Sequence, residues 1–345
     1  MHFDFDFYRS LSEAFGPTGF EDEVRDLIID FIRPHVDQLK IDGIGNLIAI
    51  KGNPEACLIT AHMDEVGFMI TEIPDNGTLR FRPVGGVDPE KLPSKTVYVG
   101  KMRLPAVIGA KPIHLTKGSK QPTVTFSDLY LDLGFQNAAE AQNLVSVGDW
   151  ATFTTPCCMQ RETLFGKAHD NRIGCYILAQ IIKEGLLTDG TFVFTVQEEC
   201  GLRGAATILG LNRFKFGIAL DTTTANDLPG VPLHKTVCQL GKGPVISFAD
   251  GATLYRRDTV RAIFEHLKAC NIPAQTKTKR TGGNEASAID KIGFGSEAIS
   301  VSTPCRYIHG PIGLFCVKDM IDILLAVVEI VKFLTCEVEA NGTFR

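Results

Sequence analysis

Residues 191–197 have the sequence TFVFTVQ, an apolar run that leads directly into Glu198 and Glu199. A short, uninterrupted apolar run is typical of a strand buried on both faces of a sheet. Similar runs occur at 46–50, 57–61, 216–220 and 298–302, and helical patterns cover 8–33 (broken near Pro17 and Gly19), 171–183, 259–269 and 321–334. This alternation predicts an α/β fold with a mostly parallel, helix-covered sheet.

Residues 71–163 have a different texture. Short β-like pieces at 79–82, 96–99, 106–108 and 123–126 are separated by Gly, Pro and Lys. Such spacing predicts a small β-barrel or sandwich. We therefore expect two domains, which the chain length of 345 residues allows. Residues 1–70 and 164–345 would form the α/β domain, and residues 71–163 an inserted β-rich domain.

Composition and charge narrow the range of partners. The net charge of -5, without a basic stripe, gives no general attraction for polyanions, so we expect no nucleic-acid partner. The stretch 321–334 is too short to cross a bilayer and contains charged residues, so we expect no membrane partner. The start MHFDFDFYRS does not resemble a secretory signal, and the ten cysteines are scattered without CxxC pairs. Both features favour a cytoplasmic protein with reduced thiols.

Metal-ligating side chains follow the predicted strands. His62 follows the run 57–61, Glu198 and Glu199 follow 191–197, Asp221 follows 216–220, and a loop after 298–302 carries His309. Asp170 precedes the helix 171–183 and could span two ions. In an open α/β sheet the carboxyl ends of parallel strands form the ligand-binding edge. With two histidines and several carboxylates there, the carboxylates would repel one another unless cations neutralise them, as a two-metal hydrolytic centre does.

Each of these residues also has a simpler interpretation when taken alone. His62 could be a structural histidine, and Asp170 could cap the helix that follows it. Glu198 and Glu199 could form a solvated strand end, and Asp221 could be a turn residue. Their joint placement at one sheet edge favours the metal centre over these alternatives.

The motifs around these residues resemble those of the M42 metallo-aminopeptidases, over nearly the whole chain. The matching segments, in the family's order, are 61–67 (AHMDEVG), 170–172 (DNR), 197–205 (QEECGLRGA), 241–244 (GKGP) and 306–309 (RYIH). The resemblance implies a zinc-peptidase-like fold and two divalent metal ions per subunit, either Zn²⁺ or Co²⁺, with Mn²⁺ as a third candidate. It also implies peptide substrates and a homo-oligomer, of which the tetrahedral dodecamer is one form, built through the β-rich insert.

The same resemblance assigns roles to individual residues. His62 and Asp221 would bind one metal, Glu199 and His309 the other, and Asp170 would bridge them. Asp64 would orient His62 from behind. Glu198 would be the general base of an aminopeptidase reaction, taking a proton from the attacking water and passing it to the leaving amine.

Two departures from the family pattern stand near the site. Cys200 replaces an aliphatic residue, and residues 282–286 read GGNEA in place of GGTDA, which changes Asn284 and Glu285. Two alternative functions remain open from sequence. One is another hydrolysis on the same centre, such as removal of an acyl group or cleavage of a glycan, although glycan cleavage normally needs two carboxylates without metals. The other is a non-catalytic assembly protein that keeps the fold.

Overall fold

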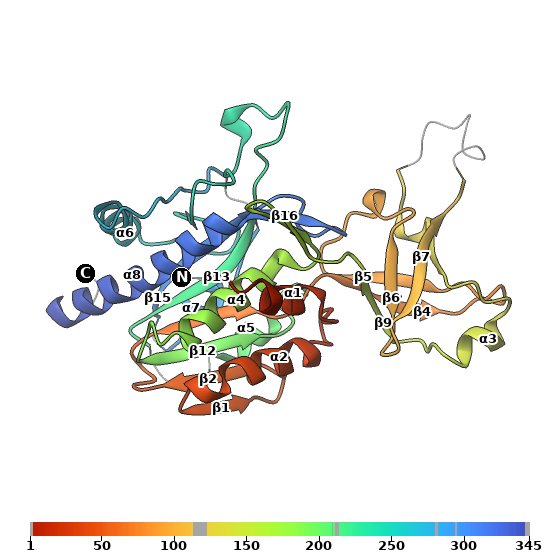
Figure 1. Cartoon of the computed structure of the whole chain (residues 1–345), viewed down its shortest axis with the longest axis horizontal. Coiled ribbons are helices and arrows are strands. Elements are labelled where there is room, and N and C mark those ends of the chain that lie inside the picture. Colours follow the sequence, from red (N-terminus) through yellow and green to blue (C-terminus); the bar gives the residue numbers. More distant parts are fainter. Residues whose placement is uncertain are drawn as a thin grey trace.

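The computed structural model describes residues 3–112, 123–208, 210, 214–279, 282–293 and 295–341. Two lobes are visible in Figure 1, a larger one with helices around a central sheet and a smaller one built of strands. Each lobe has its own cluster of buried apolar side chains. The α/β architecture with a second, β-rich unit that the sequence predicts is confirmed.

The larger lobe contains a seven-stranded sheet. Its strand order is β1-β2-β12-β3-β13-β15-β14, with bounds Gln38–Ile41, Leu47–Lys51, Gly190–Thr195, Leu58–His62, Phe216–Thr224, Glu297–Cys305 and Val245–Ile246, respectively. The four central strands β12, β3, β13 and β15 are parallel. The outer strands β1, β2 and β14 pair antiparallel. Four of the five predicted apolar runs therefore form the parallel centre of the sheet, and the run at 46–50 forms the antiparallel strand β2.

Helices cover this sheet. They are α1 (Phe5–Glu13), α2 (Asp22–Ile32), α4 (His169–Lys183), α5 (Arg203–Ile208), α6 (Arg257–Ala269), α7 (Ala286–Ile289) and α8 (Val317–Asn341). Helix α4 packs on β3 and β13, α8 packs on β15 and α4, and α7 packs on β13 and β15. Nearly every side chain of α4 is buried, which places its first residues firmly at the edge of the sheet.

The smaller lobe contains a six-stranded antiparallel sheet. The order is β5-β4-β9-β6-β7-β8, with bounds Arg80–Val84, Gly67–Glu72, Trp150–Phe153, Thr96–Val99, Leu104–Ala110 and Leu129–Asp132, and a short helix α3 (Ala138–Gln142) lies beside it. A bridge between Leu79 and Leu131 brings the two ends of the sheet together, so the sheet is nearly a closed barrel. Its core includes Phe68, whose ring makes edge contacts with Phe81 and Phe153.

A third sheet has three strands, and two of them belong to the segment that leads from the smaller lobe back to the larger one. Its strands are β10 (Cys158–Gln160), β11 (Thr163–Gly166) and β16 (Gly313–Cys316). The six-stranded sheet therefore runs from Gly67 to Phe153, and the last part of the expected insert belongs to this connecting sheet.

One expected strand is absent. Residues 123–126 were expected to be β-like, but 123–125 have no regular structure and Phe126–Asp128 form a single 3₁₀ turn. The Asp128 carboxylate accepts hydrogen bonds from the Thr125 backbone N–H (2.9 Å) and from its hydroxyl (2.6 Å). This capping box fixes a turn, so the β-branched threonine there serves the cap instead of a strand.

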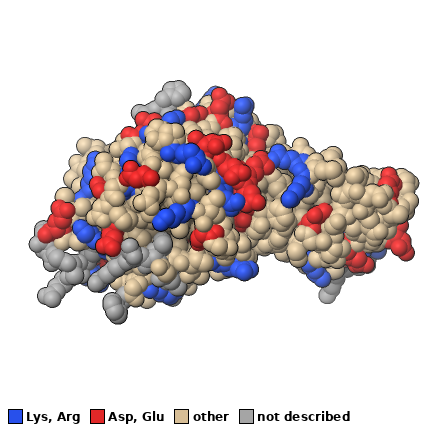
Figure 2. Space-filling model, turned by 90° about the horizontal axis from the view of Figure 1, so that it is seen from below, with Lys and Arg blue, Asp and Glu red and all other residues tan. Residues whose placement is uncertain are grey.

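The surface carries charges of both signs. On the face shown in Figure 2, acidic side chains gather where the two lobes meet, and Lys and Arg lie dispersed among them. Among the described helices, none is long and apolar enough to cross a membrane.

The contact of α5 with the end of β12 yields a stability prediction. A Cβ added to Gly204 would lie 2.3 Å from the Val196 carbonyl oxygen and 2.4 Å from Asn46 Oδ1, so the substitution Gly204→Ala forces the backbone apart. We expect it to destabilise the protein by about 1–3 kcal/mol, as overpacking does. Thermal unfolding of both proteins measures this.

The matched control is Gly43→Ala, where an added Cβ would meet no described atom within 4 Å and the backbone is not left-handed. It should unfold at the wild-type temperature. Equal melting temperatures for the two variants would contradict the close approach at Gly204.

Candidate metal centre

The predicted ligands come together at one edge of the large sheet. His62 is the last residue of β3, and Asp170 lies in the first turn of α4. Glu198 and Glu199 follow β12, and His309 lies in the loop after β15. The structure thus brings all the predicted metal-binding residues to the C-terminal edge of the parallel strands, where ligands bind in such sheets.

Asp221 differs from the expectation in one respect. It was expected at a strand end, but it lies inside β13, which continues to Thr224 because it stays paired with β15. The neighbouring strand β3 ends earlier, and its Thr60 pairs with Ala219. Asp221 is therefore level with His62 in the register, at the point where β3 stops and the sheet opens.

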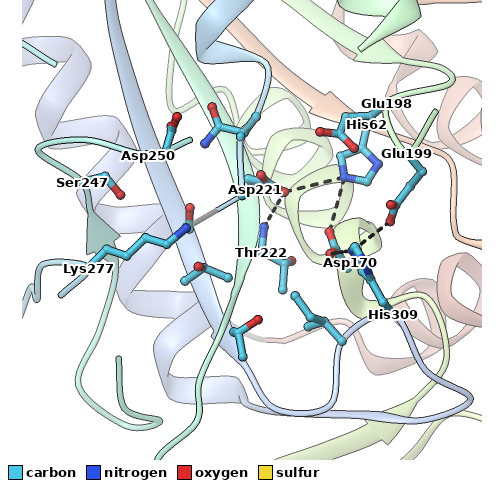
Figure 3. A pocket seen from close by; sticks show the side chains of 17 residues that line it. His62, Asp170, Glu198, Glu199, Asp221, Thr222, Ser247, Asp250, Lys277 and His309 are labelled. Carbon is cyan, nitrogen blue, oxygen red and sulfur yellow. Dashed lines mark hydrogen bonds and ion pairs between the residues drawn. The ribbon is translucent and has the colours of Figure 1, made fainter. Parts of the chain in front are cut away.

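Two groups of three side chains share one carboxylate (Figure 3). In the first group, His62 Nε2 lies 3.3 Å from Asp170 Oδ1 and 3.6 Å from Asp221 Oδ1. In the second, His309 Nε2 lies 3.2 Å from Asp170 Oδ2 and 3.4 Å from Glu199 Oε1. Asp170 therefore offers a different oxygen to each group, which is the arrangement of a bridging ligand.

These separations fit metal ligands better than hydrogen bonds. A hydrogen bond between a histidine and a carboxylate places nitrogen and oxygen about 2.7–2.9 Å apart. Two ligand atoms each about 2.1 Å from a tetrahedral ion are instead about 3.4 Å apart. In addition, Asp170 Oδ1 is buried and has no hydrogen-bond partner among the described residues. The residues present therefore fit two divalent ions.

The pKa shifts of the residues in the centre also fit a site for cations. Burial would lower the pKa of His309, but Asp170 and Glu199 outweigh it and raise that pKa to about 10. Burial and repulsion by Asp170 raise the pKa of Glu199 to about 8. The pKa of Glu198 is also raised, first by burial and then by Asp221 and Glu199. This pattern marks an excess of negative charge that bound cations would neutralise.

Asp64 contacts the backbone and side chains of the candidate metal centre. Its two oxygens accept hydrogen bonds from the backbone N–H groups of Glu198 (3.0 Å) and Glu199 (3.1 Å), and Oδ1 lies 3.3 Å from His62 Nδ1. Thr18 donates a further hydrogen bond to Oδ2 (2.9 Å). One fully buried carboxylate thus fixes both the Glu198–Glu199 turn and the back of the His62 ring.

His309 is oriented by a group that the sequence did not reveal. Its Nδ1 lies 2.9 Å from the Gly86 carbonyl oxygen, so Nδ1 donates and Nε2 is left to face the carboxylates. Gly86 follows β5 of the smaller lobe. Its neighbour Gly85 has a φ of 88°, and a Cβ there would lie 3.3 Å from Glu199 Cβ. The Gly-Gly pair was the available signal, because only glycine allows so close an approach.

The centre opens into a pocket of about 380 Å³. Besides the predicted ligands it is lined by Ser247, Asp250, Lys277 and Asn284, of which the sequence singled out only Asn284 (Figure 3). Glu285 lies buried behind this wall, where it accepts a hydrogen bond from the Thr195 hydroxyl, and burial raises its pKa to about 7.

Cys200 does not reach the centre. Its side chain is exposed, and the sulfur lies 3.7 Å from the Gln197 carbonyl oxygen. This departure from the family motif therefore affects neither set of ligands.

The role of Asp64 yields a second prediction. In Asp64→Asn an amide N–H₂ replaces one of two oxygens that both accept backbone N–H groups, so one hydrogen bond to the Glu198–Glu199 turn is lost with the negative charge. We expect metal affinity to fall by about 10–100-fold, as is usual for residues that orient ligands. Equilibrium dialysis with elemental analysis measures it. Thr18→Val, which removes only one donor to the same carboxylate, is the control, and equal affinities in both variants would contradict the role of Asp64.

Comparison with known proteins gives a consistent result. A family model described as M42 glutamyl aminopeptidase matches residues 45–324. A putative aminopeptidase of Acetivibrio thermocellus is 35% identical, over 94% of this chain and 97% of the relative. The crystal structure of a TET aminopeptidase from a marine sediment archaeon of the Thaumarchaeota has a TM-score of 0.93 at 30% identity, covering 98% of each chain. The TET1 peptidase of Pyrococcus horikoshii, whose structure is described as able to assemble into a tetrahedron or a large octahedral shell, has a TM-score of 0.84 at 30% identity, over 95% and 98% of the two chains. The chain therefore belongs to the M42 family of aminopeptidases.

Proposed function

We propose that this aminopeptidase removes N-terminal residues from peptides with two divalent metal ions and with Glu198 as general base. The observation that best supports this proposal is the position of the Asp170 carboxylate, which presents one oxygen to His62 and the other to His309. His62, Asp170 and Asp221 would hold one ion, and Asp170, Glu199 and His309 the other. Both sets contain histidine and carboxylate without thiolate, which suits Zn²⁺, Co²⁺ or Mn²⁺, and we favour zinc or cobalt.

Glu198 is distinguished from Glu199 by its surroundings. Glu199 Oε1 lies 3.4 Å from His309 Nε2, a separation that two ligands of one metal ion would have. Glu198, by contrast, belongs to neither group of three and lines the pocket. When bound, two such ions polarise the scissile carbonyl and acidify a water molecule. Glu198 would accept the proton of that water and deliver it to the leaving amine. Burial and the nearby carboxylates raise the pKa of Glu198, so its carboxylate would be a stronger proton acceptor than an exposed one.

Aminopeptidase substrates bring a positive charge to the site. Besides the residues that would hold the metal ions, the pocket is lined by the carboxyl groups of Glu198 and Asp250, which would attract a protonated peptide N-terminus. Two arginines at the start of α6, Arg256 and Arg257, do not line this pocket. Arg256 pairs with Glu297 (3.2 Å) and Arg257 with Asp258 (3.2 Å), which favours a role on the surface of α6.

The alternative of glycan cleavage is less well supported. It needs two carboxylates placed on either side of a sugar. Here Asp170, Glu199 and Asp221 each lie within 3.6 Å of a histidine nitrogen, a placement that suits metal ligands. A non-catalytic assembly protein would not need the base, the bridging carboxylate and both histidines in place.

The experiment that tests the proposal pairs two isosteric substitutions. Glu198→Gln removes the base while keeping its size, and we expect turnover of an aminoacyl chromogenic substrate to fall by about 10²–10⁴-fold or more with metal content unchanged. Glu199→Gln removes the charge of a ligand, so it should weaken one metal site and recover part of its activity at high metal concentration.

Kinetics and elemental analysis on the same samples separate the two roles. If Glu198→Gln lost a metal ion but turned over normally once saturated with metal, the roles would have to be exchanged. If chelated protein, shown by elemental analysis to be metal-free, kept full activity, the two-metal proposal would fail.

We also propose that the β-rich insert, taken as residues 71–163, is a dimerisation domain from which a larger homo-oligomer is built. Large apolar side chains are exposed on this part of the chain: Tyr98, Met102, Val107, Leu144 and Val147. Tyr98 and Val107 belong to the paired strands β6 and β7, where Thr96 lies opposite Val107. They are therefore diagonal neighbours on one outward face of the sheet.

The assembly proposal predicts a homo-oligomer that depends on this face. Sedimentation of the wild-type protein at micromolar concentration should show a large species, and Val107→Glu should shift it toward smaller ones. Leu254→Glu, at an exposed position of the larger lobe, is the control and should keep the wild-type mass. A wild-type monomer, or an unchanged mass for Val107→Glu, would refute the role of this face.

A further inference from the structure

A second cluster of metal-ligating side chains lies away from the catalytic pocket. His266 on α6, Cys270 at the C-terminal end of α6 and Glu329 on α8 bring their ligand atoms within 4.8 Å of one another. None of the three lines the pocket of the metal centre. In Figure 1, α6 and the C-terminal part of α8 lie at the end of the larger lobe that faces away from the β-rich lobe.

The distances within this cluster match the edges of a tetrahedral site. Cys270 Sγ lies 3.7 Å from His266 Nε2 and 3.7 Å from Glu329 Oε2, and His266 Nε2 lies 3.4 Å from Glu329 Oε2. With bonds of about 2.3 Å to sulfur and about 2.1 Å to nitrogen and oxygen, a tetrahedral ion places sulfur about 3.6 Å from the other two ligands and nitrogen about 3.4 Å from oxygen. The three observed edges thus agree with the three expected ones.

The ligands are also held in place by other contacts. The Cys270 backbone N–H donates to the His266 carbonyl (3.0 Å), which sets these residues one helical turn apart on the same side of α6. The His266 ring stacks on Phe333 of α8, with centroids 4.9 Å apart and an interplanar angle of 24°. Lys332 binds the other oxygen of Glu329, Oε1, at 2.8 Å, so Oε2 remains directed at His266 and Cys270.

We propose that His266, Cys270 and Glu329 form a structural binding site for a divalent transition-metal ion of the zinc class, with water as the fourth ligand. One nitrogen, one thiolate and one carboxylate are a donor set that zinc accepts and that magnesium or calcium does not favour. Cys270 is exposed, so the fourth position is open to solvent. Binding replaces the thiol proton of Cys270, which is released to solvent.

Such a site would act as a clamp between two helices. Helix α6 contacts α8, and α8 packs on α4, the helix that carries Asp170 near its start. A metal bound across α6 and α8 stabilises the folded chain alone, since the three ligands are brought together only by folding. It would therefore raise the unfolding temperature without taking part in catalysis.

The thiolate ligand makes the site visible beside the catalytic centre. Because neither proposed catalytic metal site contains cysteine, a charge-transfer band between thiolate and Co²⁺ in the near-ultraviolet reports the new site alone. We expect metal-stripped wild-type protein, titrated with Co²⁺, to develop this band. The substitution Cys270→Ser should abolish the band, reduce the bound cobalt by one ion per chain and leave aminopeptidase activity unchanged.

Two controls isolate the cluster from other thiols and from the catalytic centre. Cys336→Ser changes a different exposed cysteine, which lies on α8, and this variant should keep the band. Asp170→Asn damages the proposed catalytic metal sites and should keep the band as well, so this test is independent of the proposed function. His266→Gln should weaken cobalt binding at the cluster and reduce the metal-dependent rise in melting temperature.

The proposal is overturned if the wild-type protein shows no thiolate band at saturating Co²⁺, or if the band persists in Cys270→Ser. In the first case the three side chains would form only a surface ion pair with a neighbouring thiol. In the second, another cysteine would be the ligand.

Discussion

The sharing of one carboxylate by two histidines is the interaction around which the rest of the site is organised. Asp170 can reach both His62 and His309 only because α4 begins at the open edge of the sheet, between β3 and the loop after β15. The position carries a large concentration of negative charge, since Glu198, Glu199 and Asp221 lie around the same point. Burial makes that charge costly unless it is neutralised, which explains why both histidines are drawn toward their charged forms.

A second buried ionic network fixes the position of α4. Glu65 Oε1 accepts from Lys167 Nζ (2.5 Å) and from Arg172 Nη2 (3.3 Å), and the Arg172 Nε donates to the Met63 carbonyl (2.7 Å). Lys167 and Arg172 flank Asp170 in sequence, and Met63 and Glu65 follow His62. The network therefore ties the two chain segments that meet at the first candidate metal-binding group. Removing one member would leave a buried charge without its partner, which is far more costly than the pair itself is stabilising.

Much of this arrangement could be predicted from sequence because it follows from strand order. Four of the five buried apolar runs led to a ligand, and parallel strands deliver their C-terminal ends to one edge, as His62 and Glu199 illustrate. The exact end of β13 could not be predicted, because it depends on pairing with β15 beyond Asp221. The turn at Thr125 was mistaken for a strand, since β-branched residues favour strands and the Asp128 cap overrides that preference locally.

What sequence could not supply was the backbone of a distant segment. The Gly86 carbonyl that orients His309 comes from the β-rich lobe, 223 residues away along the chain, and the Gly85-Gly86 pair indicates a close approach without identifying its partner. This contact changes how the lobe is to be understood. If the lobe served assembly alone, the catalytic edge would be complete without it. Because His309 depends on Gly86 for its orientation, and Gly85 passes beside Glu199, the second candidate metal-binding group is built by both lobes. The β-rich lobe and this edge of the large sheet are therefore physically coupled, and a displacement of Gly86 would change the orientation of the His309 ring.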